Sequence, residues 1–195
     1  MNTPHIARSE LILGGQRSGK SRRAEMLARQ WLDAAPEHRA LLIATAQPWD
    51  AEMRERIARH RQDRAERVPG MTTVEEPLNL AQAITQNSNA QTLIVVDCLT
   101  LWLTNLLMPA GSSQQNSLPA PEPQAQTAMV LIAIQNCTGP LVLVGNEIGL
   151  GVIPMGRETR DFVDALGRLN QEVAAACERV TFMAAGLPLT LKGSP

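Results

Sequence analysis

The residues best suited to chemistry stand in a glycine-rich stretch near the start of the chain. Residues 14–21 read Gly-Gly-Gln-Arg-Ser-Gly-Lys-Ser and fit the phosphate-binding pattern G-x-x-x-x-G-K-[ST] in full. In such a loop the backbone N–H groups point at phosphate oxygens, Lys20 reaches the outer phosphates and the Ser21 hydroxyl ligates Mg²⁺. An apolar run precedes the loop and a helical pattern follows it, which favours a nucleotide site over a chance match on a turn. The predicted site residues are Gly14, Gly15, Gln16, Arg17, Ser18, Gly19, Lys20 and Ser21.

A carboxylate ends another apolar run, LIVVD, at Asp97. Open α/β sheets bind their ligands at the carboxyl ends of their strands. A carboxylate at that edge can hold Mg²⁺ directly or through water. The alternative is a helix cap for the following segment, LTLWLTNLL. Because a phosphate cradle needs a metal partner, Asp97 is predicted to be that partner.

A histidine lies among arginines in the segment 50–67. The chain has 18 basic residues, and six of them are arginines within positions 54–67. On a helix Arg56, His60 and Arg64 share one face. Arginine forks match phosphate oxygens, and nearby cations disfavour a protonated imidazole, so His60 is a candidate nucleophile. A solvated, charged helix is the alternative. His5 and His38 lie in polar surroundings and indicate nothing.

Short apolar runs alternate with helical patterns along the chain. Both faces of each run are apolar, as in the strands of a buried parallel sheet. We therefore expect one α/β domain over 1–195, P-loop NTPase-like, with a mostly parallel sheet flanked by helices. The strands are expected at 10–15, 40–46, 92–98, 141–147 and 179–186. The helices are expected at 21–34, 50–67 with Asp50 as N-cap, from Leu78, and at 158–178.

Two connections stand out from this alternation. Residues 108–126 are rich in Pro, Ser and Gln with Glu122 as their one charge, which predicts a mobile surface loop, either a plain insertion or a lid. In NEIGLGVIP, Asn146 and Glu147 end an apolar run, and Gly149 and Gly151 permit close approach to a ligand. A substrate contact and a self-capping turn both fit that second stretch.

The composition excludes several classes of protein. A formal net charge of −1 gives no overall field for nucleic acid, and no apolar run approaches the roughly 20 residues that span a bilayer. We expect no nucleic-acid partner and no membrane insertion. Three widely spaced cysteines, Cys98, Cys137 and Cys177, suit reduced thiols in the cytoplasm.

Five segments together resemble one family over nearly the whole chain and in the right order. The sequence is similar to the bifunctional adenosylcobinamide kinase/adenosylcobinamide-phosphate guanylyltransferases of cobalamin biosynthesis. The phosphate-binding pattern is shared by many families, whereas the last two segments are far more specific. The segments are GGQRSGKS, IATAQPWDAEMRERIARHRQDR, TVEEPLNL, VVDCLTLWLTNLL and NEIGLGVIP.

This resemblance implies two reactions. ATP or GTP phosphorylates the aminopropanol hydroxyl of adenosylcobinamide. GTP then gives GMP to an enzyme histidine with release of pyrophosphate, and adenosylcobinamide phosphate takes up the GMP to give adenosylcobinamide-GDP. His60 matches the guanylylated histidine because it falls in the family's R-I-x-x-H-R pattern.

The resemblance also implies further nucleotide contacts and a homotrimer with active sites near the subunit interfaces. The contacts that it adds are Ile43, Ala44, Thr45, Arg61, Gln62, Asp63, Arg64, Glu75 and Asp97. Two other readings of the phosphate-binding pattern stay open. One is a simple P-loop small-molecule kinase with no covalent intermediate, and the other is a nucleotide-dependent switch protein. The chain lacks the N-K-x-D run expected of guanine-reading switches, which weakens the second.

Overall fold

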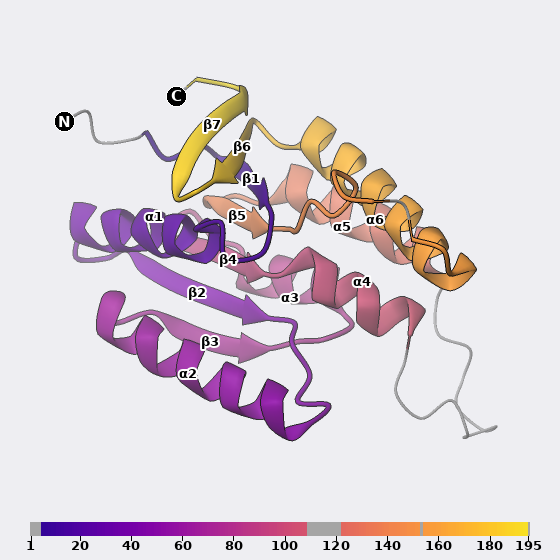
Figure 1. Ribbon diagram of the computed structural model, residues 1–195. Helices are drawn as coiled ribbons and strands as arrows, with labels where there is room; N and C mark the ends of the chain where they lie inside the picture. The colour runs from indigo at the N-terminus through magenta and orange to yellow at the C-terminus, as the bar shows by residue number, and fades with distance from the viewer. Residues whose placement is uncertain (1–4, 109–121, 153, 195) are drawn as a thin grey trace, which may run out of the picture.

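A seven-stranded sheet organises the molecule. The computed structural model describes residues 5–108, 122–152 and 154–194 (Figure 1). The strands lie in the order β3-β2-β4-β5-β1-β6-β7, and all neighbouring pairs are parallel except β6 and β7. The strands are β1 (Ser9–Gly14), β2 (Arg39–Ala44), β3 (Thr72–Glu75), β4 (Thr92–Asp97), β5 (Leu141–Val144), β6 (Arg179–Ala184) and β7 (Leu187–Lys192).

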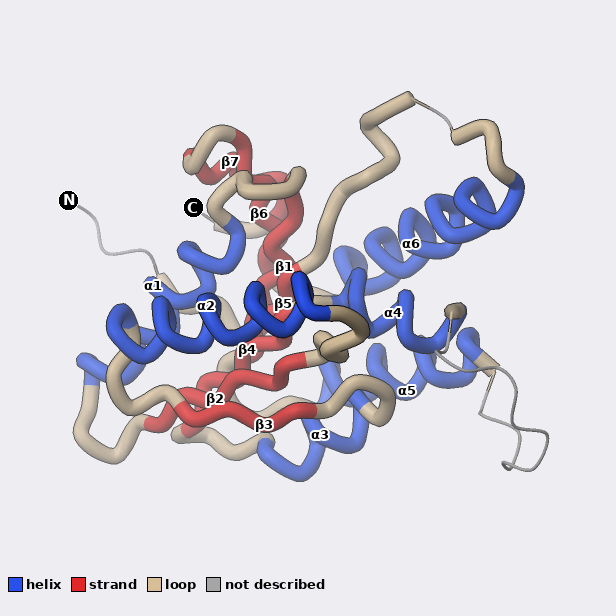
Figure 2. Tube along the Cα trace, turned by 60° about the horizontal axis from the view of Figure 1, so that its bottom comes forward, coloured by secondary structure: helices blue, strands red, loops and turns tan. Residues whose placement is uncertain are grey.

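Helices cover both faces of this sheet (Figures 1 and 2). The helices are α1 (Lys20–Ala34), α2 (Ala51–Arg67), α3 (Leu80–Asn87), α4 (Leu99–Leu107), α5 (Pro123–Asn136) and α6 (Arg157–Ala176). Side chains alternate along β1, so that Leu11 and Leu13 pack with α3 to α6 whereas Ile12 packs with α1. Because both faces of its middle part are covered, the central strands β2, β4 and β5 are largely apolar, and the expected mostly parallel α/β class is confirmed.

Several predicted boundaries were wrong. No strand was expected at β3 or β7, and the segment 78 onward becomes helical only at Leu80, with Asn79 as N-cap. The strand expected at 141–147 ends at Val144. Of the predicted loop 108–126, residues 123–126 already belong to α5, and 109–121 lie outside the described residues. The single-domain expectation stays a prediction.

Helix α2 is confirmed with its expected cap. The Asp50 carboxylate accepts a hydrogen bond from the Met53 N–H at 2.7 Å. The helix is highly polar, and Arg64 is the one buried residue among its described side chains. Its attachment to the protein therefore depends on charged contacts more than on apolar packing.

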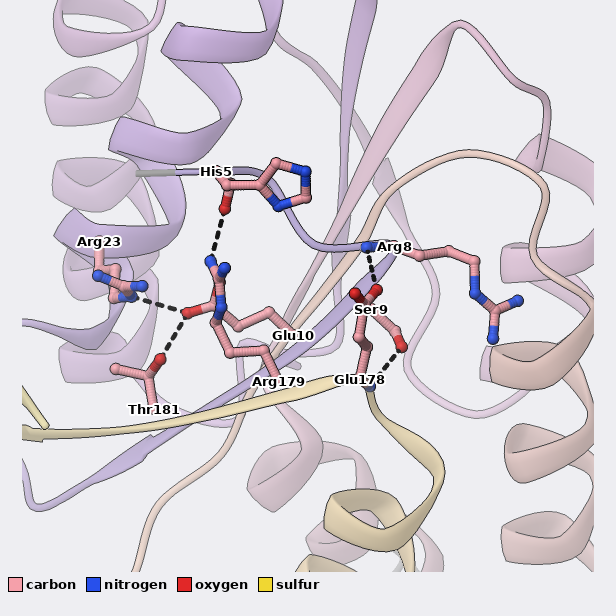
Figure 3. Close-up of polar contacts among 8 residues, drawn as sticks. All are labelled: His5, Arg8, Ser9, Glu10, Arg23, Glu178, Arg179 and Thr181. Atoms are coloured by element: carbon pink, nitrogen blue, oxygen red, sulfur yellow. Dashed lines mark hydrogen bonds and ion pairs between the residues drawn. The ribbon is translucent and has the colours of Figure 1, made fainter. Parts of the chain in front are cut away.

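A buried ionic cluster joins β1, α1 and β6 on the amino-end side of the sheet (Figure 3). The Glu10 carboxylate, 1% exposed, accepts hydrogen bonds from Arg23 Nε and Thr181 Oγ1, each at 2.8 Å. Arg179 Nη1 lies 3.4 Å from the same carboxylate and donates to the His5 carbonyl at 2.6 Å. Two guanidinium groups thus depend on one buried carboxylate.

Among the described residues, no helix is long and apolar enough to cross a membrane.

Replacing that carboxylate is expected to destabilise the fold. Glu10→Gln keeps the shape of the side chain and leaves Arg23 and Arg179 without a counter-charge, so we expect a loss of roughly 3 kcal/mol in the free energy of unfolding. Urea unfolding followed by far-UV circular dichroism measures this loss. The control is Asp33→Asn, which breaks the exposed Arg29–Asp33 pair and is expected to change stability by at most about 0.5 kcal/mol. Equal losses in the two variants would contradict the assignment.

Candidate functional site

The glycine-rich loop between β1 and α1 is built from backbone conformations that side chains disfavour. Gly14 and Gly19 have φ angles of +151° and +103°, and Arg17 has a φ of +57°. The Ser18 N–H donates to the Gly15 carbonyl at 3.3 Å, which closes the turn before α1 begins at Lys20. Gly15, Gln16 and Arg17 are exposed at the tip of the loop. The result is the curled backbone that a phosphate cradle requires.

Two groups of this loop face inward. Lys20 is 8% exposed, and its Nζ donates to the Gly14 and Gly15 carbonyls at 3.0 and 2.6 Å. Ser18 Oγ is buried and has no hydrogen-bond partner among the described residues. Ser21, in the first turn of α1, is half-buried. An ammonium group and an orphaned hydroxyl at a helix N-terminus are suited to an anion.

The turn between β6 and β7 supports the loop from behind. The Gly186 N–H donates to the Ser18 carbonyl at 3.0 Å. A Cβ at Gly14 would lie 2.5 Å from the Met183 carbonyl oxygen, and a Cβ at Gly19 would lie 3.2 Å from the Gly186 Cα. The glycines are therefore required by close backbone packing as well as by their φ angles.

Charges from three elements converge beside the loop. Asp97, at the end of β4, is close enough to Lys20 and Arg64 to affect the pKa of both. Burial lowers the pKa of the Lys20 ammonium group, whereas the nearby Asp97 carboxylate raises it. Burial likewise lowers the pKa of the Arg64 guanidinium, opposed by Asp97 and then Glu25. The structure thus brings the predicted residues Lys20, Asp97 and Arg64 together.

The residues at the end of β2 are largely buried. Ile43 and Thr45 are fully buried, and Ala44 is half-buried. Thr45 Oγ1 donates to the Cys98 carbonyl at 2.8 Å and accepts from the Cys98 N–H at 2.9 Å. Thr45 therefore fixes the backbone next to Asp97, and a nucleotide contact from these three residues stays a prediction. Burial raises the pKa of the neighbouring Cys98 thiol to about 12, so this group is protonated at neutral pH.

The predicted residues of α2 do not share one environment. Arg64 is 9% exposed, whereas His60 is exposed, and its imidazole has no hydrogen-bond partner within the described part of the chain. Arg61 forms an ion pair with Glu75 at the end of β3. Gln62 and Asp63 bond along the helix to Glu66 and Arg67. The side chain of Arg56 lies outside the described residues. The resemblance predicted Arg61 and Glu75 as separate nucleotide contacts, and their ion pair is a finding of the structure. His60 lies one turn, or about 6 Å along the axis, from Arg64.

Sequence reasoning missed the residues that hold these elements in place. Asn105 Nδ2 donates to the carbonyls of Thr45 and Pro77 at 2.8 and 3.0 Å, and Trp102 Nε1 donates to the Leu78 carbonyl at 2.9 Å. A buried asparagine in the apolar stretch LTLWLTNLL was a usable signal. Glu25 of α1, which pairs with Arg67 at 3.1 Å, gave no such signal because exposed-looking helix carboxylates are common.

The donor atoms here suit a polyphosphate with a hard cation. Within the described residues there is no group of three or more His, Cys, Asp or Glu side chains that could hold a metal by itself. Mg²⁺ is commonly held by one or two protein oxygens with water and phosphate, and Ser21 and Asp97 offer a hydroxyl and a carboxylate. The site can therefore bind a nucleoside triphosphate, with Lys20 and Arg64 compensating its charge.

Comparison with known proteins identifies close relatives. A family model described as cobinamide kinase / cobinamide phosphate guanyltransferase (CobU) matches residues 10–191. The bifunctional adenosylcobalamin biosynthesis protein CobP of Pseudomonas aeruginosa is 46% identical over 95% of this chain and 98% of its own length. The bifunctional adenosylcobalamin biosynthesis protein CobU of Escherichia coli is 36% identical over 93% of this chain and 98% of its own length.

A solved structure confirms the type of fold. The flagellar accessory protein FlaH from Methanocaldococcus jannaschii matches 98% of this chain and 80% of its own chain, with a TM-score of 0.52. At 12% sequence identity the likeness concerns the fold alone. It agrees with the P-loop NTPase-like arrangement that the sequence predicted.

Adding a methyl group at Gly14 is expected to disrupt the loop. In Gly14→Ala the new Cβ meets the Met183 carbonyl and Ser18 Oγ in a backbone conformation unfavourable to alanine, so we expect a loss of about 1–3 kcal/mol. Thermal and urea unfolding measure it. Gly15→Ala is the matched control, because a Cβ there has no neighbour within 4 Å, and its stability is expected to change by at most about 0.5 kcal/mol. An unchanged Gly14→Ala variant would contradict the packing described for this loop.

Proposed function

The chain belongs to the cobinamide kinase / cobinamide phosphate guanyltransferase family, and from this premise we propose that it transfers GMP through a covalent adduct on His60. It is a bifunctional enzyme, a kinase and a guanylyltransferase. In the kinase reaction the γ-phosphoryl group of ATP or GTP goes to the aminopropanol hydroxyl of adenosylcobinamide. In the second reaction adenosylcobinamide phosphate and GTP give adenosylcobinamide-GDP and pyrophosphate.

The proposed transfer has two balanced steps. An imidazole nitrogen of His60 attacks the α-phosphorus of GTP, a P–N bond forms, and the bond to the β-phosphate oxygen breaks to release pyrophosphate. A phosphate oxygen of adenosylcobinamide phosphate then attacks the same phosphorus, the P–N bond breaks, and the imidazole is restored. Covalent catalysis of this kind divides one difficult displacement into two easier ones.

The observation that carries this proposal is the anchoring of α2 at the phosphate site. Arg64 is the buried residue among the described side chains of α2, and its guanidinium is near Asp97, which is also near Lys20. His60 precedes Arg64 by one helical turn on the same side of the helix. A helix fixed at the triphosphate by Arg64 thereby carries an exposed imidazole, ready to act as nucleophile, along the same edge.

The remaining residues have supporting roles in the proposal. Lys20 and Arg64 stabilise charge on the transferring phosphoryl group and on the departing pyrophosphate. Ser21 and Asp97 would hold Mg²⁺, which neutralises phosphate charge when bound. Arg61, paired with Glu75, extends the cationic surface along α2. Backbone N–H groups at the exposed tip of the loop and at the start of α1 would bind the phosphate oxygens.

The family resemblance further suggests a homotrimer that works in the cytoplasm, and the proposal includes both. Sedimentation of the purified protein tests the assembly. A trimer would agree with the proposal, whereas a stable monomer with full activity would remove this part of it and leave the chemistry in place.

Substitution of His60 is expected to abolish covalent labelling. The protein is incubated with Mg²⁺ and α-labelled GTP, and its intact mass is measured. We expect a GMP adduct that is acid-labile and base-stable, as a phosphoramidate is, and that is absent in His60→Ala. The control is His5→Ala, since His5 is exposed and its hydrogen bond to Arg179 comes from its backbone carbonyl. Tight GTP binding without any adduct would favour a simple P-loop kinase. Slow GTP hydrolysis with no transfer to cobinamide would favour a switch protein.

Formation of the adduct is expected to slow at acid pH. Protonation removes the lone pair with which the imidazole attacks, so the rate of GMP–enzyme formation should fall as the pH drops below neutral. Rapid-quench measurements over a series of buffers from acid to neutral pH give this profile. A rate that stays flat across the range would count against a histidine nucleophile.

A further inference from the structure

An exposed apolar segment follows β5, close to the phosphate-binding loop. Leu150, Val152 and Met155 are 78%, 96% and 95% exposed, and Ile148 is also exposed. We call these four side chains the apolar arm. Figure 2 shows the loop between β5 and α6 extending away from the sheet. Large apolar side chains grouped in water mark a site of interaction.

Hydrogen bonds hold both ends of this loop. At its start the Asn146 N–H donates to Thr100 Oγ1 at 2.8 Å, and Asn170 Nδ2 donates to the Asn146 carbonyl at 3.1 Å. At its end Arg160 donates to the carbonyls of Pro154 and Met155. The apolar arm is thus held away from the protein's own core by fixed backbone at either side, and its exposure is a built feature of the loop.

The arm is also tied to the phosphate-binding loop. The Glu147 N–H donates to the carbonyl of Gly14, the first residue of that loop, at 3.2 Å. Gly145 donates to the Ile12 carbonyl at 3.0 Å, in the strand that leads into it. The start of the loop that carries the apolar arm, at Gly145 and Glu147, therefore lies beside the phosphate-binding loop.

The charges on the two sides of the phosphate-binding loop differ. The arginines of α2 suit phosphate groups, whereas residues 145–156 carry one ionisable side chain, Glu147, whose Oε1 accepts from the Gly149 N–H at 2.9 Å. A triphosphate gains nothing from Leu150, Val152 and Met155. The kinase and transferase reactions need a second substrate at the same phosphates, and a corrinoid offers a large ring whose edge carries methyl groups between its amide side chains.

The geometry points to the apolar arm as the docking surface for the apolar edge of the corrinoid ring, which places the substrate's side-chain hydroxyl or phosphate beside the nucleotide. This inference rests on the proposed function for the identity of the second substrate. It gives a role to the NEIGLGVIP stretch, for which the sequence left a ligand contact and a self-capping turn open. Glu147 and Gly149 form the turn, and the exposed side chains beyond them form the surface.

The test is a double variant, Val152→Ser with Met155→Ser, whose fully exposed side chains contribute little to folding. Cobinamide binding is followed by equilibrium dialysis with the visible absorbance of the corrinoid, together with GTP affinity, formation of the GMP–enzyme adduct and molar mass. We expect the dissociation constant for cobinamide to rise about tenfold, with the other three quantities unchanged. The control is Met129→Ser with Ile132→Ser on α5, an exposed apolar pair away from the phosphate loop, which should change none of the four.

Several results would overturn the inference. Unchanged cobinamide affinity in the double variant overturns it directly. A change of molar mass would make the apolar arm an interface between copies of this chain, and a loss of GTP affinity would make it a base-binding surface. The same measurements test the proposed function separately. If the unmodified protein forms the adduct and the double variant binds cobinamide with unchanged affinity, this inference is wrong and the His60 chemistry stands. If the unmodified protein forms no adduct and the double variant binds cobinamide more weakly, the His60 chemistry is wrong and the docking surface stands.

Discussion

The charge cluster of Lys20, Asp97 and Arg64 is the interaction on which the candidate site depends. Two cations share the neighbourhood of one carboxylate in a partly buried setting, where burial lowers the pKa of both cationic groups. Charges removed from water are costly unless they are compensated, and Asp97 offsets both cations while Glu25 also offsets Arg64. A bound polyphosphate would add further negative charge beside the two cations. The three residues come from α1, β4 and α2, so the same cluster joins the nucleotide loop, the sheet edge and the histidine-bearing helix.

Helix α2 shows why this family member uses arginine so heavily. No apolar side chain of α2 is fully buried among those described, Met53 and Ile57 being half-buried, and its charged contacts include the Arg64 cluster, the Arg67–Glu25 pair and the Arg61–Glu75 pair. A guanidinium group makes several directed hydrogen bonds, stays charged when partly buried and fits both carboxylate and phosphate oxygens. A lysine at these positions would give a point charge without that geometry. The position of His60 is thus set by ion pairs, which can exchange one anionic partner for another more readily than an apolar interface can repack.

The sequence predicted the features that depend on a local motif or on the position at which a strand ends. Residues 14–21 carry their own backbone requirement, and Asp97 ends a strand that the apolar run LIVVD predicted. Glu75 came only from the family resemblance, because no strand was expected at β3. The missed elements have another origin. Strand β3 is short and exposed, and β7 exists because its antiparallel pairing with β6 overrides a weak local signal. The nucleotide contact of Thr45 stays a prediction, and the hydrogen bonds of its hydroxyl with the Cys98 backbone were not foreseen. Such long-range pairings have no periodicity that a single sequence reveals.

One phosphate-binding loop serves two reactions, which places a geometric demand on the surroundings. In the kinase reaction the nucleophile attacks the terminal phosphorus of a nucleotide, and in the transferase reaction it attacks the innermost phosphorus. Two reacting atoms must therefore be reached from the same phosphate-binding loop. Helix α2, which carries the arginines and His60, is placed at the phosphate-binding loop by Arg64, which lies near Asp97. The apolar arm is joined to the same loop by the hydrogen bond from the Glu147 N–H to the Gly14 carbonyl. These separate attachments let nucleotide and corrinoid be held by unlike chemistry, cationic for one and apolar for the other. A substrate held by its ring edge keeps its reactive side chain free to present first a hydroxyl and then a phosphate at the same loop.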